Sequence, residues 1–336
     1  MKTLVTGGLG YIGSHVAINL INAGYEIVIV DNLSNSNIKT LKLIEKIVGK
    51  SVSFHLIDVR NYQELNKLFK AENFESVVHL SGLKAVGESV IDPLRYYDHN
   101  VSGSINLFKC MKEHNVKKLV FSSSATVYGN PQYLPIDENH PINPINPYGR
   151  TKAKIEGILE DLHNSDNDFA FISLRYFNPI GSHKSGLIGD SPEGIPNNLM
   201  PYILKVFNKE LDILNVFGDD YKTPDGTGIR DYIHITDLAH GHLNALNALT
   251  KNNKISQFIN LGTGKGFSVF DVIKSFENIS KFKIPYKVCS RRSGDVESCY
   301  ADPSKAKEIL NWEADLTLDD MTESALKFIQ KNKLNI

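Results

Sequence analysis

A phenol and an ammonium group lie four residues apart in the stretch NPYGRTK, at Tyr148 and Lys152. Pro147 directly precedes the tyrosine, and proline favours the first turn of a helix. On a helix that begins there, residues i and i+4 lie on one face, so both side chains point the same way. Because a neighbouring cation helps a tyrosine to lose its proton, the pair is a candidate proton acceptor.

Hydroxyl groups follow an apolar run, KKLVFSSS at 117–124, which ends in three serines. If the run is a strand of a parallel sheet, Ser124 lies at the carboxyl edge, where open α/β folds bind ligands. Oxidation of a secondary alcohol removes a hydride from carbon and a proton from oxygen, so a base must contact the hydroxyl. We predict Tyr148 as that base, with Ser124 holding the same oxygen. Lys152 and a positively charged nicotinamide would lower the tyrosine pKa from its usual value of about 10.

A glycine-rich turn after the first apolar run predicts a dinucleotide site. In TGGLGYIGSHVAINL, Gly7, Gly10 and Gly13 give the spacing G-x-x-G-x-x-G, and Gly8 completes G-x-G-x-x-G. Such glycines let a pyrophosphate approach the backbone N–H groups at the start of a helix. Asp31 follows the next apolar run, where a carboxylate accepts from ribose hydroxyls and repels a 2′-phosphate, so NAD is favoured over NADP.

Short apolar runs alternate with helix-like segments through the first half of the chain. They predict strands at 3–7, 26–31, 52–58, 76–82, 117–124 and 170–178, with helices at segments such as 12–23 and 101–114. Apolar strands separated by helices are typical of a parallel sheet covered on both faces. Residues 1–177 are therefore predicted to form a doubly wound α/β Rossmann domain. Asp58 and Val59, at the end of the third run, are expected to border the adenine.

The regular pattern fades after about residue 178 into a stretch rich in Gly, Ser and Pro. That change predicts a second, smaller α/β domain over 178–336 that holds the substrate. The segment 229–250 again has the pattern of a strand followed by a helix, and it could return to the first domain.

Composition excludes several classes of function. The 336 residues are 41% hydrophobic and 22% charged with a net charge of −1, which is typical of a soluble protein and argues against nucleic-acid and membrane-surface binding. No export signal and no apolar run long enough to span a membrane is expected. Three cysteines, at 110, 289 and 299, are far apart and lack metal-ligand spacing, so we expect no disulfide framework and no metal, in a reducing cytoplasm.

The glycine turn, Ser124 and the Tyr148/Lys152 pair together resemble the extended short-chain dehydrogenase/reductase superfamily. Within it, the chain is similar to the UDP-glucose 4-epimerase family from Lys2 to about Trp312. The similar stretches are GLKAVGES (82–89), SSSATVYG (122–129), RYFNPIGSHKSG (175–186), IPNNLMPYI (195–203), FGDDYKTPDGTGIRDYIHITDLAHGH (217–242) and RRSGDVESCYAD (291–302).

This resemblance implies interconversion of UDP-galactose and UDP-glucose by a homodimer. Hydride would pass from sugar C4 to bound NAD while Tyr148 takes the C4 hydroxyl proton; the 4-keto sugar would rotate and take the hydride back on its other face. Arginine is a planar donor suited to a diphosphate, and a carboxylate can accept from ribose. Cofactor contacts are expected from Gly7, Gly10, Tyr11, Ile12, Gly13, Asp31, Asn32, Asn35, Asp58, Val59, Leu80, Lys84, His99 and Phe177. Substrate contacts are expected from Asn178, Asn198, Leu199, Asn215, Phe217, Arg230, Arg292, Asp295 and Cys299.

Three positions bear on details of the resemblance. His99 stands where the family often has an asparagine, and Leu80 where it often has a phenylalanine. Cys299 occupies a position that is either tyrosine or a small residue in the family, and a small residue leaves space beside the sugar C2 for an N-acetyl group. Because a pocket excludes a larger sugar by sterics but does not readily reject a smaller one, the N-acetylhexosamine pair is expected as a substrate as well.

Other functions on the same fold stay open. A nucleotide-sugar 4,6-dehydratase would share the Tyr/Lys pair, but it needs an acid pair to eliminate water, and Ala125 and Thr126 occupy that place. A plain NAD-dependent dehydrogenase would release reduced cofactor. A non-catalytic NAD-sensing protein would need neither Tyr148 nor Lys152, and both are present.

Overall fold

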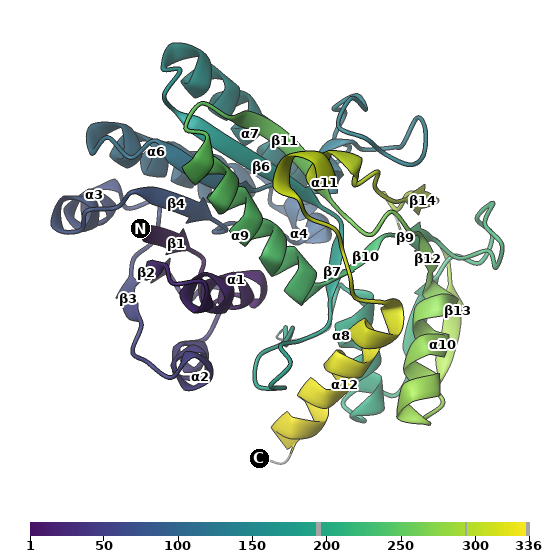
Figure 1. Ribbon diagram of the computed structural model, residues 1–336. Coiled ribbons are helices and arrows are strands. Elements are labelled where there is room, and N and C mark those ends of the chain that lie inside the picture. The colour runs from purple at the N-terminus through teal and green to yellow at the C-terminus, as the bar shows by residue number, and fades with distance from the viewer. Residues whose placement is uncertain (193–195, 293, 334–336) are drawn as a thin grey trace.

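The centre of the molecule is a parallel sheet, seen in a computed structural model that describes residues 1–192, 196–292 and 294–333 (Figure 1). Its strands are β1 (Lys2–Thr6), β2 (Glu26–Asp31), β3 (Ser53–Leu56), β4 (Ser76–His79), β5 (Lys118–Ser122), β6 (Ala170–Tyr176) and β11 (Ser256–Leu261). They lie in the order β11-β6-β5-β4-β1-β2-β3, and every neighbouring pair is parallel. The predicted doubly wound Rossmann sheet is therefore confirmed.

The apolar runs form strands because both faces of the sheet are buried. In β1, the successive residues Leu4 and Val5 are fully buried and belong to two different core clusters, one on each face. Helices α1 (Tyr11–Asn22), α2 (Lys39–Val48), α9 (Ile235–Lys251) and α11 (Ser304–Leu310) supply the cluster on one face. Helices α3 (Tyr62–Ala71), α6 (Gly103–Glu113) and α7 (Pro147–Ser165) supply the other.

The strand order reverses beside β1, which has β2 on one side and β4 on the other. In open parallel sheets, ligands bind in the crevice that such a reversal leaves at the carboxyl ends of the strands. The connection from β4 to β5 passes over this region through α4 (Val86–Ile91), α5 (Pro93–Tyr96) and a π-helix, η1 (Tyr97–Ser102), which leads into α6. A short 3-10 helix, η2 (Ala125–Val127), follows β5.

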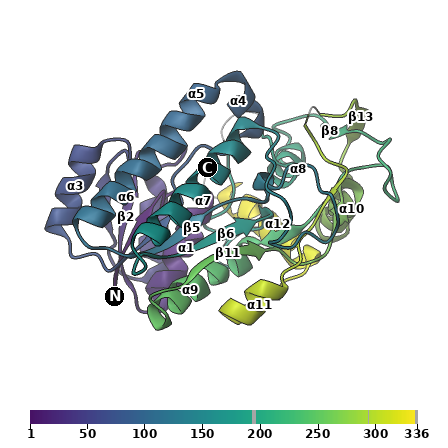
Figure 2. The ribbon, with the colours of Figure 1, turned by 90° about the horizontal axis from the view of Figure 1, so that it is seen from above.

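A second group of elements packs around its own apolar cluster beside the sheet (Figure 2). Its helices are α8 (Leu199–Phe207), α10 (Val269–Ser280) and α12 (Leu318–Lys333). Its strands are β7 (Asn178–Ile180), β8 (Leu214–Phe217), β9 (Ile229–Arg230), β10 (Tyr232–His234), β12 (Phe267–Ser268), β13 (Tyr286–Cys289) and β14 (Ser298–Cys299). They pair as three small sheets, β10-β7, β12-β9-β14 and β13-β8.

The chain crosses back to the large sheet after β10. Helix α9 lies beside α1 on one face, and β11 then adds the edge strand next to β6 (Figure 1). Residues 235–261 thus lie with the first 177 residues in space. Among the residues that the structure describes, no helix is both long enough and apolar enough to cross a membrane.

Candidate active site

The turn between β1 and α1 is built for close approach to its backbone. Gly7 has a φ of 70°, and a Cβ there would lie 2.8 Å from the backbone nitrogen of Ser81. A Cβ on Gly13 would lie 2.1 Å from the Gly7 carbonyl oxygen, so the helix start can pack on the turn only as glycine. At Gly10, by contrast, an added Cβ would meet only the Gly7 carbonyl oxygen, at 3.4 Å. No acidic side chain occupies the first turn of α1, so its N–H groups and dipole are available to an anion.

Asp31 lies next to this turn, where β2 ends, and its side chain is buried. One carboxylate oxygen accepts from the Leu9 N–H at 3.1 Å, and the other accepts from the Leu33 N–H at 2.9 Å and the Ser36 hydroxyl at 2.7 Å. A carboxylate has about four acceptor positions, so the three bonds leave one for a ribose hydroxyl. The turn and this carboxylate together fit a dinucleotide.

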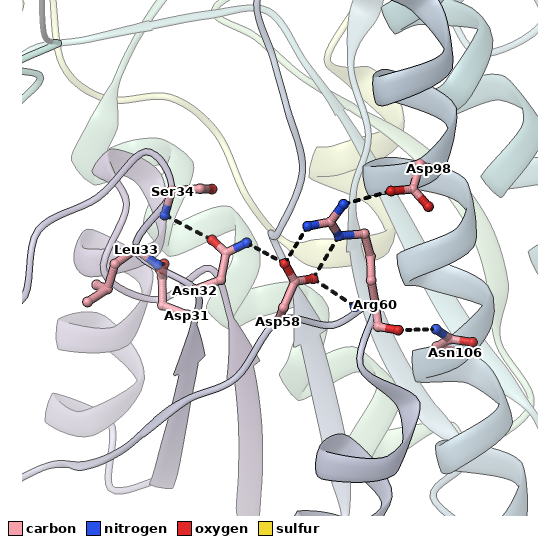
Figure 3. Close-up of polar contacts among 8 residues, drawn as sticks. All are labelled: Asp31, Asn32, Leu33, Ser34, Asp58, Arg60, Asp98 and Asn106. Atoms are coloured by element: carbon pink, nitrogen blue, oxygen red, sulfur yellow. Dashed lines mark hydrogen bonds and ion pairs between the residues drawn. The ribbon is translucent and has the colours of Figure 1, made fainter.

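The neighbouring strand end carries a polar network (Figure 3). Asn32 donates to Asp58 at 2.9 Å, and Asp58 in turn is held by Arg60, whose hydrogen bonds keep the pKa of this carboxyl far below its usual range. Val59 is buried in the core cluster under α3 and α6, so it anchors the strand end. Asn35 is exposed.

Further predicted cofactor residues lie at the start of α1 and in the connection that follows β4. The Leu80 N–H bonds to the Thr6 carbonyl at 3.1 Å, which continues the β1–β4 pairing beyond the strand. The exposed Lys84 extends over the ring of Tyr11, with its ammonium 5.9 Å from the ring centroid. Ile12, the second residue of α1, packs at the edge of the core. His99 lies half-buried in the π-helix.

The three residues predicted to be catalytic, Ser124, Tyr148 and Lys152, lie at the end of β5 and on the first turns of α7. Asn146 caps α7 by accepting the Gly149 N–H at 2.8 Å, and Pro147 occupies the first turn, so the helix starts where the sequence predicts. Tyr148 and Lys152 are both buried on this helix, and the ammonium lies 5.9 Å from the tyrosine ring centroid. Lys152 also donates to the carbonyl oxygen of Ser122 at 2.6 Å. The helix thereby fixes both side chains against the carboxyl edge of the sheet.

Burial sets the protonation of this triplet. It raises the pKa of Tyr148 to about 12, against the lowering effect of a hydrogen bond with Ser124. It lowers the pKa of Lys152 to about 8, against the raising effect of Glu156. In the protein alone, loss of solvation outweighs the hydrogen bond from Ser124, and the lowering of the tyrosine pKa by Lys152 together with a bound nicotinamide stays a prediction.

Two buried residues that the sequence did not single out hold this arrangement. Asn100 of the π-helix accepts the Leu83 N–H at 2.8 Å and donates to the Leu83 carbonyl at 3.0 Å and the Thr151 hydroxyl at 3.0 Å. It thus joins the loop after β4 to the helix turn between Tyr148 and Lys152. Tyr96 packs against Tyr148, and its hydroxyl bonds to the Ala85 backbone. The sequence signal for Asn100 is a polar residue within a helical pattern, but this signal does not identify its partners, which are far away in sequence.

A second buried network lies below the triplet. Glu156 and Arg175 form an ion pair at 2.8 Å with both side chains about 5% exposed. Glu156 also accepts from the hydroxyls of Ser123 at 2.6 Å and Ser173 at 3.0 Å. The network therefore joins α7 to β5 and β6 directly beneath Lys152 and Ser124.

The predicted substrate residues lie on the second group of elements. The Arg292 guanidinium stacks over the Phe217 ring at 4.5 Å, and Arg230 approaches Asp295 at 3.7 Å. The Asn215 side-chain oxygen is buried without a hydrogen-bond partner, which leaves an acceptor free for a ring N–H. The remaining predicted positions are exposed at the start of β7 (Asn178) and the N-terminus of α8 (Asn198), and half-buried in its first turn (Leu199).

The two parts of the predicted site meet at Phe177 and Cys299. Phe177 is buried directly after β6, in a small core cluster that Cys299 packs against. Cys299 pairs with Arg230 in the register of β14 and β9. Burial raises the pKa of its thiol to about 11, so the side chain is neutral at physiological pH. Where a dehydratase would need carboxylates after the strand, Ala125 is buried and the Thr126 hydroxyl donates to Ser124 at 3.0 Å.

Comparisons with known proteins agree with this geometry. Residues 4–325 match the family model described as GDP-mannose 4,6 dehydratase. A UDP-glucose 4-epimerase of Dictyostelium discoideum is 52% identical over 331 residues, which are 98% of this chain and 96% of that protein. The crystal structure of a UDP-glucose 4-epimerase from Stenotrophomonas maltophila, with bound NAD and formylated UDP-arabinopyranose, superposes over 100% of both chains with a TM-score of 0.97 at 43% identity.

A second solved structure is also similar over its whole length. The UDP-glucose 4-epimerase from Bifidobacterium longum, crystallised with NAD+ and UDP, gives a TM-score of 0.94 at 48% identity over 100% of both chains. Identities near one half across almost the entire length extend to both the cofactor turn and the second group of elements. The chain therefore belongs to the UDP-glucose 4-epimerase family of the extended short-chain dehydrogenases/reductases.

Proposed function

We propose that the protein is an NAD-dependent epimerase that interconverts UDP-galactose and UDP-glucose through a 4-keto sugar. The observation that carries this proposal is the buried Ser124, Tyr148 and Lys152 triplet at the carboxyl edge of a dinucleotide-type sheet. The family membership supports the choice of epimerase over dehydratase, since curated relatives of nearly full length are epimerases.

In this reaction NAD, held at the glycine turn and Asp31, accepts the C4 hydride and returns it. Tyr148 takes the proton of the C4 hydroxyl and later gives it back, while Ser124 holds the same oxygen. Lys152 stabilises the tyrosinate; because both groups are buried, their attraction is stronger than it would be in water. Net redox change is zero, so the cofactor is expected to stay bound through turnover.

Epimerisation requires that the sugar present both faces while the nucleotide stays in place. We assign the nucleotide anchor to the Phe217/Arg292 stack, to Arg230 with Asp295, and to the free acceptor of Asn215. Binding energy at that end keeps the substrate in the site while the 4-keto sugar rotates. Residues 1–177 together with the returning segment 235–261 are proposed as the NAD domain, and the rest of 178–336 as the substrate domain.

We also assign activity on the N-acetylhexosamine pair, on the strength of Cys299. Its neutral thiol is small and packs against the cluster of Phe177. Substitution Cys299→Tyr would fill the space beside the sugar C2. It is expected to abolish conversion of UDP-N-acetylgalactosamine while conversion of UDP-galactose continues, and equal conversion of both sugars by this variant would contradict the pocket assignment.

In the direct test, purified protein is incubated with UDP-galactose without added NAD, and the anomeric proton signals of the sugar are followed by NMR. Conversion of UDP-galactose to UDP-glucose supports the epimerase with retained cofactor. Formation of a stable 4-keto-6-deoxy product would point to a dehydratase, and no turnover even with added NAD would point to a non-catalytic NAD-binding protein.

We further propose that the enzyme works in the cytoplasm as a homodimer. All three of its cysteines are free thiols, as a reducing compartment allows. The dimer rests on the family resemblance, and light scattering coupled to gel filtration measures it directly; a monomer mass would overturn it.

A further inference from the structure

Arg60 lies between two carboxylates at the adenosine end of the site (Figure 3). Its guanidinium binds Asp58 through two nitrogens, at 3.0 Å and 2.8 Å, and Asp98 through a third at 2.7 Å. The fork geometry of arginine makes such paired contacts directional as well as attractive. A contact of Asn106, which donates to the Arg60 carbonyl at 2.8 Å, fixes the backbone from which the side chain extends.

These contacts join two segments that are separate in sequence. Asp58 lies two residues after the end of β3 and also binds Asn32, which directly follows β2. Asp98 belongs to the π-helix η1. Arg60 therefore ties the strand ends beside Asp31 to the π-helix, across 38 residues of chain.

The π-helix is also attached at the reaction end of the site. Asn100, two residues after Asp98, holds the Leu83 backbone and the Thr151 hydroxyl of α7. One short helix is thus tied to the adenosine side through Arg60 and to the Tyr148 side through Asn100. A motion that opens the adenosine end must break the contacts of Arg60 or pull on η1.

The contacts of Arg60 are partly exposed to solvent. The side chains of Arg60, Asp58 and Asp98 are 35%, 27% and 56% exposed, so water and salt screen them in part. Each ion pair of this exposure stabilises a closed conformation only modestly, and several pairs that act together stabilise it more. Contacts of this kind are suited to holding two segments together while still allowing them to separate from time to time.

We propose that Arg60 is a positioning residue that closes the adenosine end of the NAD site, as a clasp with Asp58 and Asp98, and so slows cofactor release. The inference rests on the proposed function, because it takes NAD as the cofactor. Arg60 acts through the two carboxylates and need not touch NAD itself. No other role for the bridge is required by the reaction, which takes place at the opposite end of the cofactor.

The test measures dissociation of NAD from the full-length protein. Protein carrying radiolabelled NAD is mixed with excess unlabelled NAD, and the retained label is followed over time. Arg60→Gln is expected to release NAD about 3- to 10-fold faster than wild type at about 0.01 M ionic strength, a range that corresponds to one or two partly exposed ion pairs. At about 1 M salt the two proteins are expected to release NAD at similar rates, because salt screens the wild-type clasp.

Two further variants separate the clasp from a general loss of structure. Asp98→Asn should accelerate release as Arg60→Gln does, and the double variant should be no faster than either single one. Lys117→Gln is the matched control, since Lys117 also lies between two carboxylates, Asp166 and Asp168, at similar exposure but at the start of β5. It should release NAD at the wild-type rate.

The outcomes distinguish this inference from the function on which it rests. Release at the wild-type rate from both Arg60→Gln and Asp98→Asn at low salt, in protein that still epimerises, would overturn the clasp alone. Equal acceleration by Lys117→Gln would also overturn it, since surface charge in general would then be responsible. Wild-type protein that binds no NAD would overturn both.

Discussion

The buried ion pair below the active site gives the sharpest prediction of stability. Glu156 and Arg175 are almost completely buried, and the carboxylate accepts two hydrogen bonds from serine hydroxyls besides those from the guanidinium. Substitution Glu156→Gln keeps the size and most of the hydrogen bonds but removes the negative charge. The arginine then stays buried with no opposing charge.

The expected loss in the free energy of unfolding is large, because the charge of Glu156 no longer offsets the cost of burying the Arg175 guanidinium. Removal of one partner from a buried pair lowers the free energy of unfolding by about 3–5 kcal/mol, whereas replacement of both partners by neutral groups is often close to neutral. Glu156→Gln should therefore be destabilised by about that amount, and Glu156→Gln/Arg175→Met should recover to within about 2 kcal/mol of wild type. Since Glu156 raises the pKa of Lys152, the single variant should also lose activity at a lower pH than wild type.

Urea unfolding at neutral pH, followed by circular dichroism, measures the first effect, and the pH dependence of kcat/KM measures the second. Lys117→Gln serves as a control for an exposed pair and should change the unfolding free energy by less than about 1 kcal/mol. A Glu156→Gln protein within about 1 kcal/mol of wild type would refute the reasoning, because Arg175 would then have found solvent or another partner. A double variant as unstable as the single one would refute it too.

Three further predictions concern the site and the buried histidine below it. Tyr148→Phe removes the proposed base, so turnover should fall by about 10²- to 10⁴-fold with NAD content unchanged, and a loss under tenfold in an NMR assay would contradict that role. Gly13→Ala places a Cβ 2.1 Å from the Gly7 carbonyl, so the purified protein should contain little NAD on denaturation, and a full complement would mean that the turn adapts. Burial lowers the pKa of His79 to about 3. The unfolded chain therefore takes up a proton below about pH 6.5 that the folded one does not, and stability should fall by up to about 1.4 kcal/mol per pH unit as pH drops from there. Urea unfolding at pH 7 and pH 5.5 should show a smaller difference in His79→Asn than in wild type, and identical differences would argue against a buried neutral imidazole.

Local patterns in the sequence predict the large sheet well. The six predicted strands match β1 to β6, and most of their ends agree within two residues, because most of the runs are apolar on both faces and bounded by polar or glycine residues. The start of α7 is equally readable, since Asn146 and Pro147 are a capping residue and a first-turn proline. Local signals of this kind suffice wherever the deciding contacts are close in sequence.

The parts that the sequence did not predict depend on distant partners. The edge strand β11 was not predicted, and nothing in its residues indicates that it pairs with β6. Asn100 and Glu156 read as ordinary polar residues of helices, and only the fold brings Leu83 to the one and Arg175 to the other. Likewise, the raised pKa of Tyr148 follows from how deeply the phenol is buried, which spacing in the sequence does not reveal.

The central claim is that the C4 hydride leaves the sugar and returns to it inside one closed site. It is tested most directly with UDP-galactose that carries deuterium at C4, incubated with the purified protein in ordinary water. The account predicts UDP-glucose that retains deuterium at C4, because the hydride is held by the bound cofactor and never exchanges with solvent. Product that carries hydrogen at C4 would contradict the account, since the label would then have been lost to water by proton transfer at carbon.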